Sequence, residues 1–275
     1  MGGTSTRARL SQGGHTVAEA VGEGANVTTV DPELVEIRLT KLIADLGSPR
    51  PAACCAGAAG SEFPAGRRLL EVLLARLLPQ TKVLVVHDAR LILAAAGVDS
   101  GIALIAGTGS VAYGRDAAGN EARAGGWGWL LGDEGGGAWI TREALRELMR
   151  RRDAGEPVGA LGDALFASTG THDPLELAGK LQGDHLAARW AAQARVVLES
   201  PDPAAVRIRE NAAGALAALV EQVRARLAID GPVVMAGGLL RNFPGLQAAV
   251  RDRVGESILL SEEPVAGAVR IAETL

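Results

Sequence analysis

The stretch "IALIAGTGSVAYGRDAAGNEARAGG", from Ile102 to Gly126, decides the fold class. An apolar run enters the Gly-Thr-Gly-Ser turn of residues 107–110, a second apolar run follows, and a polar turn at 116–120 leads into further chain. This order predicts a strand, a tight turn and a β-hairpin. The first turn offers a ligand mainly backbone N–H groups and the hydroxyls of Thr108 and Ser110, which suits an anion. An ordinary hairpin turn is the alternative.

A weak internal repeat favours the anion-binding interpretation. "GGTSTRARLSQGGHTVAEA" (Gly2–Ala20) and "GTGSVAYGRDAAGNEARAG" (Gly107–Gly125) share a Gly/Thr/Ser turn, a short strand, a polar Gly turn and a second strand. The second copy is preceded by the apolar strand "GIALIA" (Gly101–Ala106), whereas the first copy starts at Met1, where that strand should end. Two such units predict two lobes that face one ligand, with two Gly-Thr loops that bind a polyphosphate from both sides.

The flanking sequence alternates short apolar runs with helical patterns, which predicts an α/β fold. We expect an N-terminal lobe of residues 1–96 with a closing helix at 263–275, and a C-terminal lobe of 97–262. We expect strands at 52–60, 82–89 and 232–240, and helices at 64–78, 141–152, 203–229 and 264–275.

Composition excludes several partners. The chain has 275 residues, 48% of them hydrophobic and 22% charged, and a net charge of −4, so no basic surface dominates and we expect no nucleic-acid partner. No apolar run approaches the ~20 residues of a membrane span, so we expect no membrane partner. The adjacent Cys54 and Cys55 suit small buried residues in a reducing cytoplasm. No Cys/His spacing predicts a metal site.

The segment "AGGWGWLLGDEGGG" (Ala124–Gly137) is the least ordinary part of the sequence. It combines a glycine-freed backbone, aromatic faces and a carboxylate, Asp133. This combination suits a polyol or a sugar, whose hydroxyl groups need paired donors and acceptors. A packed glycine-rich turn with tryptophan in the core is the alternative.

Three further positions are candidates for chemistry. Asp88 ends the "VLVV" strand just before a helix, where a carboxylate serves either as a general base or as a helix N-cap. Asn26, in "GEGANVTT", is either a ligand-binding amide or a turn residue. The glycine pair in "MAGGLL" (Met235–Leu240) follows a strand and is either a ligand contact or a plain tight turn.

These residues together resemble the bacterial and animal N-acetylglucosamine kinase group of the sugar kinase/Hsp70/actin superfamily, which adjoins the BadF-type ATPases. "HDA", "IAGTGSVAYGRDAAG" and "GGWGWLLGDEGGGAWI" match its central block almost continuously, and "GGTSTRARL", "GEGAN" and "AGG" match more weakly in the same order. The resemblance covers most of the chain and is thin over residues 150–230. It implies two RNase-H-like lobes, with ATP, Mg²⁺ and an amino sugar between them.

The resemblance also implies residue roles. Asp88 would accept the proton of the sugar 6-hydroxyl. The residues implied to contact ATP are Gly3, Thr4, Thr108, Gly109, Gly237 and Gly238. The residues implied to hold the sugar are Asn26, Ser110, Gly126, Trp127, Gly128 and Asp133. A homodimer is a family expectation.

One departure from the family concerns the amino end. The family's first loop reads Asp-Gly-Gly-Gly-Thr after a strand, but Met1 stands where the first of those glycines would be. The aspartate that the family uses near Mg²⁺ is missing from that place, and so is the strand. We therefore expect that Met1 is not the natural start or that the chain has been trimmed at this end. No residue of this sequence is assigned to the metal.

The leading hypothesis is ATP-dependent phosphorylation of an amino sugar, N-acetylglucosamine, at its 6-hydroxyl. Glucosamine is a rival acceptor. A dehydratase-activating ATPase is a second rival, although adjacent cysteines on a buried strand suit a shared cluster poorly. A nucleotide- and sugar-binding sensor without catalysis is the alternative from another class.

Overall fold

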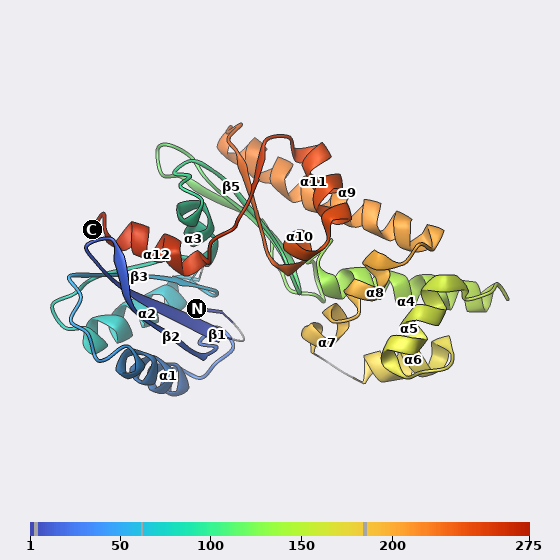
Figure 1. The fold of residues 1–275 in the computed structure, drawn as a ribbon, viewed down its shortest axis with the longest axis horizontal. Coiled ribbons are helices and arrows are strands. Elements are labelled where there is room, and N and C mark those ends of the chain that lie inside the picture. Colours follow the sequence, from blue (N-terminus) through green and yellow to red (C-terminus); the bar gives the residue numbers. More distant parts are fainter. Residues whose placement is uncertain (3–4, 62, 184–185) are drawn as a thin grey trace. The chain divides into compact units, whose positions relative to one another are not determined.

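The computed structural model describes residues 1–2, 5–61, 63–183 and 186–275, which divide into two compact units (Figure 1). Unit 1 comprises Met1–Asp99 and Leu260–Leu275, and unit 2 comprises Ser100–Leu259. Each unit packs helices against β-structure, so the predicted α/β class is confirmed. In the described part of the chain, no helix combines the length and the apolar character that a bilayer crossing requires.

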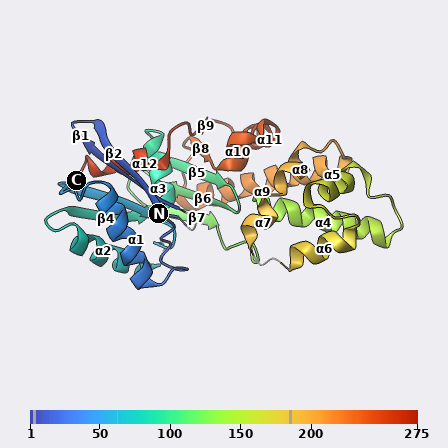
Figure 2. The same cartoon turned by 60° about the horizontal axis from the view of Figure 1, so that its bottom comes forward.

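Unit 1 contains two strand pairs. An antiparallel pair joins β1 (Ser5–Gln12) to β2 (His15–Glu23), and a parallel pair joins β3 (Ala53–Ala58) to β4 (Lys82–His87). The helices are α1 (Pro32–Asp45), α2 (Pro64–Leu77), α3 (Asp88–Ala95) and α12 (Pro264–Ala272). Helices α1 and α2 cover one side of these strands, and α3 and α12 cover the other (Figures 1 and 2).

Unit 2 is built on one mixed sheet in the order β7-β6-β5-β8-β9. Its strands are β5 (Gly101–Ala106), β6 (Ser110–Arg115), β7 (Glu121–Gly125), β8 (Val233–Ala236) and β9 (Ser257–Leu259). Strand β5 is antiparallel to β6 and parallel to β8, and nearly all of its residues are buried. A strand that is paired on both edges and covered on both faces needs the continuous apolar run that "GIALIA" supplies.

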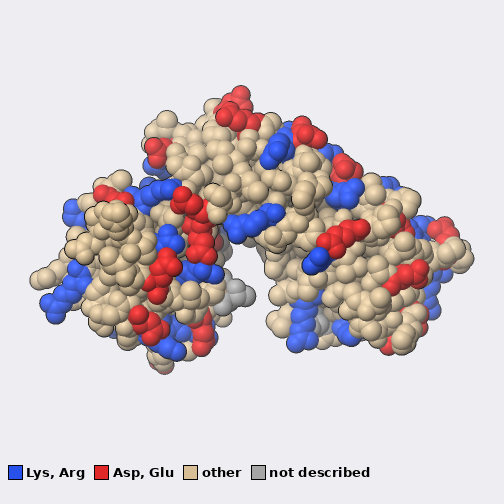
Figure 3. Space-filling model, in the orientation of Figure 1, with Lys and Arg blue, Asp and Glu red and all other residues tan. Residues whose placement is uncertain are grey.

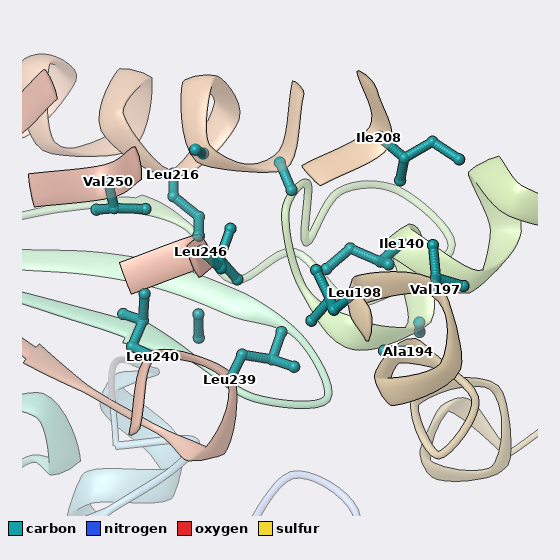
Figure 4. Packing of buried hydrophobic residues seen from close by; sticks show 14 of the residues in the cluster. Ile140, Ala194, Val197, Leu198, Ile208, Leu216, Leu239, Leu240, Leu246 and Val250 are labelled. Atoms are coloured by element: carbon teal, nitrogen blue, oxygen red, sulfur yellow. The ribbon is translucent and has the colours of Figure 1, made fainter. Parts of the chain in front are cut away.

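The helices of unit 2 extend the core away from the sheet. They are α4 (Gly137–Asp153), α5 (Gly159–Thr169), α6 (Pro174–Gln182), α7 (Ala187–Ala191), α8 (Ala194–Glu199), α9 (Pro203–Leu227), α10 (Gly238–Asn242) and α11 (Pro244–Val254). Leu216 of α9 and Leu246 of α11 lie close together near the strands, and Ile140 of α4 lies near Val197 and Leu198 of α8 (Figure 4). One cluster of buried residues joins the sheet to this helical region. The helical sequence pattern of this region predicted packed helices and no further role.

Two local expectations needed correction. The helix expected from Thr141 begins earlier, at Gly137, because the carbonyls of Gly107 and Thr108 accept the first free N–H groups of α4, those of Gly137 and Ala138. The cysteines on β3 are only half-buried.

Candidate functional site

The Gly-Thr-Gly-Ser turn of unit 2 joins β5 to β6 and rests on the start of α4. Gly107 donates its N–H to the carbonyl of Gly109 at 2.9 Å, which closes the turn. The carbonyls of Gly107 and Thr108 accept from Gly137 at 2.8 Å and from Ala138 at 3.1 Å. The turn is therefore held by a helix that comes some thirty residues later in the chain.

Asp133 packs directly against this turn. A Cβ atom built on Gly109 would lie 2.0 Å from Oδ2 of Asp133, so only glycine leaves space for the carboxylate. Asp133 adopts φ 59°, a left-handed conformation that aspartate tolerates better than most residues. Asp133, which is expected to hold the sugar, therefore contacts Gly109, which is expected to contact ATP.

Hydrogen bonds of the loop 125–136 fix the surroundings of Asp133. Gly128 donates its N–H to Oδ1 of Asp133 at 3.3 Å, Ser110 Oγ donates to the carbonyl of Glu134 at 2.7 Å, and Gly126 donates its N–H to the carbonyl of Ser110 at 2.9 Å. Burial raises the pKa of the Asp133 carboxyl above its usual range, against the opposing effect of the Gly128 and Ser110 hydrogen bonds. Ser110, Gly126, Gly128 and Asp133 thus form one polar cluster.

The side chains of Trp127 and Trp129 lie in different environments. Trp129 packs against the buried Trp190 in a tilted arrangement with ring centroids 5.8 Å apart, whereas Trp127 is 69% exposed. An exposed indole beside a half-buried carboxylate offers the apolar face and the polar edge that a pyranose ring needs.

Arg123, which the sequence pattern did not single out, organises the Trp127 loop. Its Nε donates to the carbonyl of Gly125 at 3.1 Å, its guanidinium also donates to the carbonyl of Gly126, and the group lies 5.2 Å from the centroid of the Trp127 ring. The available signal was a lone arginine inside the short strand that precedes Gly-Gly-Trp. Its role depends on the geometry of the loop, which the sequence pattern did not show.

The Gly237-Gly238 pair lies at the end of β8, beside the end of β5. Gly237 adopts φ 97°, and a Cβ atom there would lie 2.2 Å from the carbonyl oxygen of Ala106. Gly238 begins α10. Because β5 ends at Ala106 and the Gly107 turn follows, unit 2 gathers the expected ATP contacts Thr108–Gly109 and Gly237–Gly238 at one end of its sheet.

Asp88 of unit 1 is the first residue of α3, at the carboxyl end of β4. His87 is the N-cap: its Nδ1 lies 3.1 Å from the N–H of Ala89 and also 3.1 Å from Oδ1 of Asp88. Nδ1 accepts from Ala89 when it is unprotonated and donates to Asp88 when it is protonated, so it cannot serve both at once. Burial raises the pKa of Asp88, but His87, the α-ammonium group of Met1 and the Ala89 N–H outweigh it and hold this pKa below its usual range.

Asn26 lies beside the loop that follows β3. Its Oδ1 accepts from the N–H of Thr28 at 2.9 Å and from its hydroxyl at 2.7 Å, and a Cβ atom built on Gly60 would lie 2.9 Å from the same oxygen. The two hydrogen bonds form the side-chain turn that was the alternative interpretation of this residue, and they leave its NH₂ group for other partners. Of the first expected ATP loop, Gly3 and Thr4 lie outside the described residues.

The described residues contain no group of three or more His, Cys, Asp or Glu side chains arranged to hold a metal ion. A Mg²⁺ ion that keeps several waters and binds mainly to phosphate oxygens needs no such group.

The model of the BadF/BadG/BcrA/BcrD ATPase family matches residues 1–272. The chain belongs to this family. The resemblance found in the sequence is thereby confirmed.

Relatives and solved structures agree with this assignment. The chain is 34% identical over 185 residues to an N-acetylmuramic acid/N-acetylglucosamine kinase from Clostridium acetobutylicum, a match that covers 63% of this chain and 60% of the relative. It is 28% identical over 196 residues to an N-acetyl-D-glucosamine kinase from Dictyostelium discoideum, covering 67% and 61%. The matches thus span about three fifths of the length of these curated relatives.

A crystal structure from Chromobacterium violaceum, described as that of a candidate N-acetylglucosamine kinase, superposes with a TM-score of 0.75 at 25% identity. The match covers 98% of this chain and 95% of that one. The actin-like ATPase fold expected for the BadF-type family is therefore confirmed for this chain.

Proposed function

We propose that this protein is a kinase that transfers the γ-phosphoryl group of ATP to the 6-hydroxyl of an amino sugar, with N-acetylglucosamine as the acceptor. Family membership supports the use of ATP, and the two curated kinase relatives support an amino-sugar acceptor. The single observation that carries the proposal is the packing of Asp133 on Gly109, which couples a sugar-type carboxylate to a phosphate-type turn.

The glycine turns of unit 2 suit a nucleotide. At Gly237 and Gly109 a side chain would collide with Ala106 and Asp133, so glycine is required for the close backbone packing of the turns where adenosine and phosphates are expected. In this proposal Thr108 and Gly109 contact phosphate, as would Gly3 and Thr4, while Gly237 and Gly238 contact the adenosine. ATP supplies the phosphoryl group, and Mg²⁺ neutralises charge on its phosphates.

The chain's own residues position the acceptor and take up its proton. Asp133, Ser110 and the backbone of Gly126 and Gly128 would pair with sugar hydroxyls, Trp127 would cover the ring, and Asn26 would donate from its amide. Asp88 would accept the 6-hydroxyl proton; its low pKa keeps it ionised at neutral pH. Phosphoryl transfer leaves little covalent work for a protein, so positioning and charge dominate.

The cysteines argue against the rival in which an iron–sulfur cluster is shared between chains. Burial raises the pKa of Cys54 to about 11 and that of Cys55 to about 12, which disfavours the thiolate that a cluster needs. Cytoplasmic location and a homodimer remain part of the proposal.

The test is an ADP-release assay with Mg·ATP and a panel of N-acetylglucosamine, N-acetylmuramic acid, glucosamine and glucose. We expect turnover of one amino sugar, and Asp88→Asn should lower kcat by roughly 10²–10⁴-fold while sugar binding persists. The exposed Asp45→Asn serves as the matched control and should leave the rate unchanged. Sugar binding without turnover by the unmodified protein would instead support the sensor.

A further inference from the structure

His87 is a buried, titratable side chain that the proposed reaction does not use. It is the last residue of β4, directly before Asp88, and it is 9% exposed. Histidine is the side chain type whose charge ordinarily changes between about pH 5 and pH 8. A buried imidazole beside the proposed base is therefore placed to change the charge around that base near neutral pH.

The backbone that carries His87 is held in place by Ser61. The Ser61 side chain is 1% exposed, and its Oγ lies 2.7 Å from the carbonyl oxygen of Ala58 and 2.9 Å from that of Val86. Ala58 is also the residue that pairs with His87 in the parallel register of β3 and β4. The Ser61 hydroxyl therefore joins the ends of these two strands, so a rearrangement at His87 is confined to side chains and hydrogen atoms.

Three polar groups meet at this end of β4. Nδ1 of His87 lies 3.1 Å from the backbone nitrogen of Ala89 and 3.1 Å from Oδ1 of Asp88. The Ala89 N–H also donates to the Asp88 carboxylate and so contributes to its low pKa. The Ala89 N–H thus has two acceptors within reach. Nδ1 is one of them only while it carries no proton.

The proton on His87 decides how many donors Asp88 receives. When the imidazole is neutral, its Nδ1 accepts from the Ala89 N–H as the N-cap of α3 and donates nothing to Asp88. When it is protonated, Nδ1–H donates to Oδ1 of Asp88, and the Ala89 N–H is left for the same carboxylate. Added donors and a nearby positive charge both stabilise a carboxylate, which makes it a weaker base.

We propose that His87 is a positioning residue that switches the proposed base with pH: the neutral imidazole leaves Asp88 competent, and the imidazolium withdraws it. This inference rests on the proposed function. In the competent state the O–H bond of the sugar 6-hydroxyl breaks as the phosphoryl group is transferred, and its proton goes to the Asp88 carboxylate. His87 acts on Asp88 and does not contact the sugar in this proposal.

Each element packed against α3 or β4, and the chain end at Met1, carries a further charged or titratable group. These groups are the α-ammonium group of Met1, Cys55 of β3, Arg67 of α2, Arg90 of α3 and Arg270 of α12. Arg67 and Arg270 donate to backbone carbonyls, at 3.3 Å to Ser61 and at 2.9 Å to Ala94. Met1 acts on the pKa of Asp88 through its charge, as His87 does. All five groups stay the same in the variants below, so a difference between variants reports on the His87–Asp88 pair.

His87→Asn separates the switch from the helix cap. Asparagine is a good N-cap, so its Oδ1 should accept from the Ala89 N–H and α3 should stay intact, but its amide never becomes charged. Between pH 8 and pH 5.5 we expect kcat of the unmodified protein to fall at least about tenfold and kcat of His87→Asn to fall less than about threefold. Protonation of ATP affects both chains alike. Superimposable pH profiles of kcat would overturn the proposal.

His15→Asn is the matched control, because it makes the same chemical change at an exposed position of β2. Its pH profile of kcat should superimpose on that of the unmodified protein. If His15→Asn flattened the acid side of the profile as much as His87→Asn does, the effect would not belong to the pair at the end of β4, and the proposal would be wrong.

The coupling between His87 and Asp88 has a readout that needs neither ATP nor sugar. The histidine ring signals are followed by NMR through a pH titration, and the signal that is missing in His87→Asn identifies His87. In Asp88→Asn we expect the pH midpoint of this signal to fall by about one unit or more, because a neutral amide no longer stabilises the imidazolium. The exposed Asp45→Asn should leave the midpoint where it is.

The two readouts distinguish this inference from the proposed function. An unchanged His87 midpoint in Asp88→Asn would overturn the switch even if the protein phosphorylates an amino sugar. A shifted midpoint in a chain that phosphorylates no sugar would support the pairing of His87 with Asp88 and contradict the proposed function.

Discussion

Gly237 has the least freedom to change of the residues in the candidate site. Its φ of 97° disfavours any side chain, and a Cβ atom would meet the Ala106 carbonyl at 2.2 Å. Gly237→Ala should therefore destabilise the protein by roughly 3 kcal/mol, because backbone strain and a clash with β5 act together. Chemical denaturation measures the change in the free energy of unfolding.

Gly214→Ala is the control for this substitution. Gly214 lies inside α9 with open space at its Cβ position, so alanine should raise stability by about 0.5–1 kcal/mol through its higher helix propensity. The opposite signs expected for the same chemical change separate a required glycine from a tolerated one. A neutral Gly237→Ala would show that β8 can shift away from β5.

Arg123 sets the geometry of the proposed sugar loop from behind. Arg123→Gln removes the stacking on Trp127 and the bonds to two loop carbonyls, so we expect the KM for the sugar to rise about tenfold with a smaller change in kcat. Arg123→Lys keeps the charge and should recover part of the loss. Steady-state kinetics with the sugar varied at saturating ATP makes the measurement.

The control for Arg123 is Arg195→Gln, which breaks an exposed pair with Glu199 on α8. Surface pairs of this kind contribute little, so KM should not move. If Arg123→Gln lowered kcat and left KM unchanged, the Trp127 loop would hold its position without the guanidinium. The guanidinium would then act in a step after sugar binding.

At the scale of elements, Asp202 ties three helices together. It caps α9 by accepting from the N–H of Ala204 at 2.9 Å, it accepts from the N–H of Leu161 of α5 at 3.3 Å, and it binds Arg151 of α4 through both oxygens at 2.8 and 3.0 Å. The side chain is 5% exposed. The Arg151 hydrogen bonds, with the two backbone N–H groups, lower the pKa of Asp202 to about 2 against the opposing effect of burial.

This pKa predicts a loss of stability in acid. A carboxyl whose pKa is lower in the folded state stabilises that state above its unfolded pKa of about 4, and the contribution is lost as the pH falls toward 2. The loss should amount to about 2 kcal/mol. Urea unfolding at pH 6, 4 and 2.5 should show it in the unmodified protein and show less in Asp202→Asn.

Asp202→Asn should also be less stable at pH 6, because the nearly buried Arg151 then loses its bidentate carboxylate and keeps only Glu147, at 2.9 Å from its Nε. Glu199→Gln, at an exposed surface pair, is the matched control and should change neither value. A pH profile of Asp202→Asn identical to that of the unmodified protein would assign the acid loss to other carboxylates.

Local sequence signals predicted the helices and strands better than they predicted the contacts within the candidate site. The apolar periodicity and the proline at the first turn located α2, α9 and α12 within a few residues, because these signals act inside one helix. The start of α4 was placed too late, because its first N–H groups are satisfied by the distant Gly107 turn. The contact between Gly109 and Asp133 and the role of Arg123 depend on the packing of separate segments, which periodicity does not encode.

At the scale of the whole molecule, the two units differ in how many segments of the chain form them. Unit 2 is the contiguous segment Ser100–Leu259, whereas unit 1 needs the C-terminal residues from Leu260 onward. Helix α12 packs so closely on α3 that a Cβ atom at Gly267 would lie 2.0 Å from the carbonyl of Leu91. Acidic and basic side chains are mixed over the face shown in Figure 3, without a continuous patch of one sign there.

Contiguity predicts that unit 2 folds without unit 1. Its large buried cluster lies entirely within Ser100–Leu259, so the isolated segment should unfold cooperatively in a thermal melt followed by circular dichroism. The isolated Met1–Asp99 segment should not, because it lacks α12 and exposes the apolar surface of α3 and β3 that α12 covers.

Two glycine substitutions, one in each unit, should assign the unfolding transitions of the full chain to unit 1 and unit 2. Gly267→Ala forces α12 away from α3 and should lower the unfolding temperature of unit 1, while Gly237→Ala should lower that of unit 2. Differential scanning calorimetry of both variants, with the isolated unit 2 as the reference, tests this assignment. If both substitutions lowered one common transition equally, the two units would unfold as a single cooperative body, and the independence inferred from chain order would be wrong.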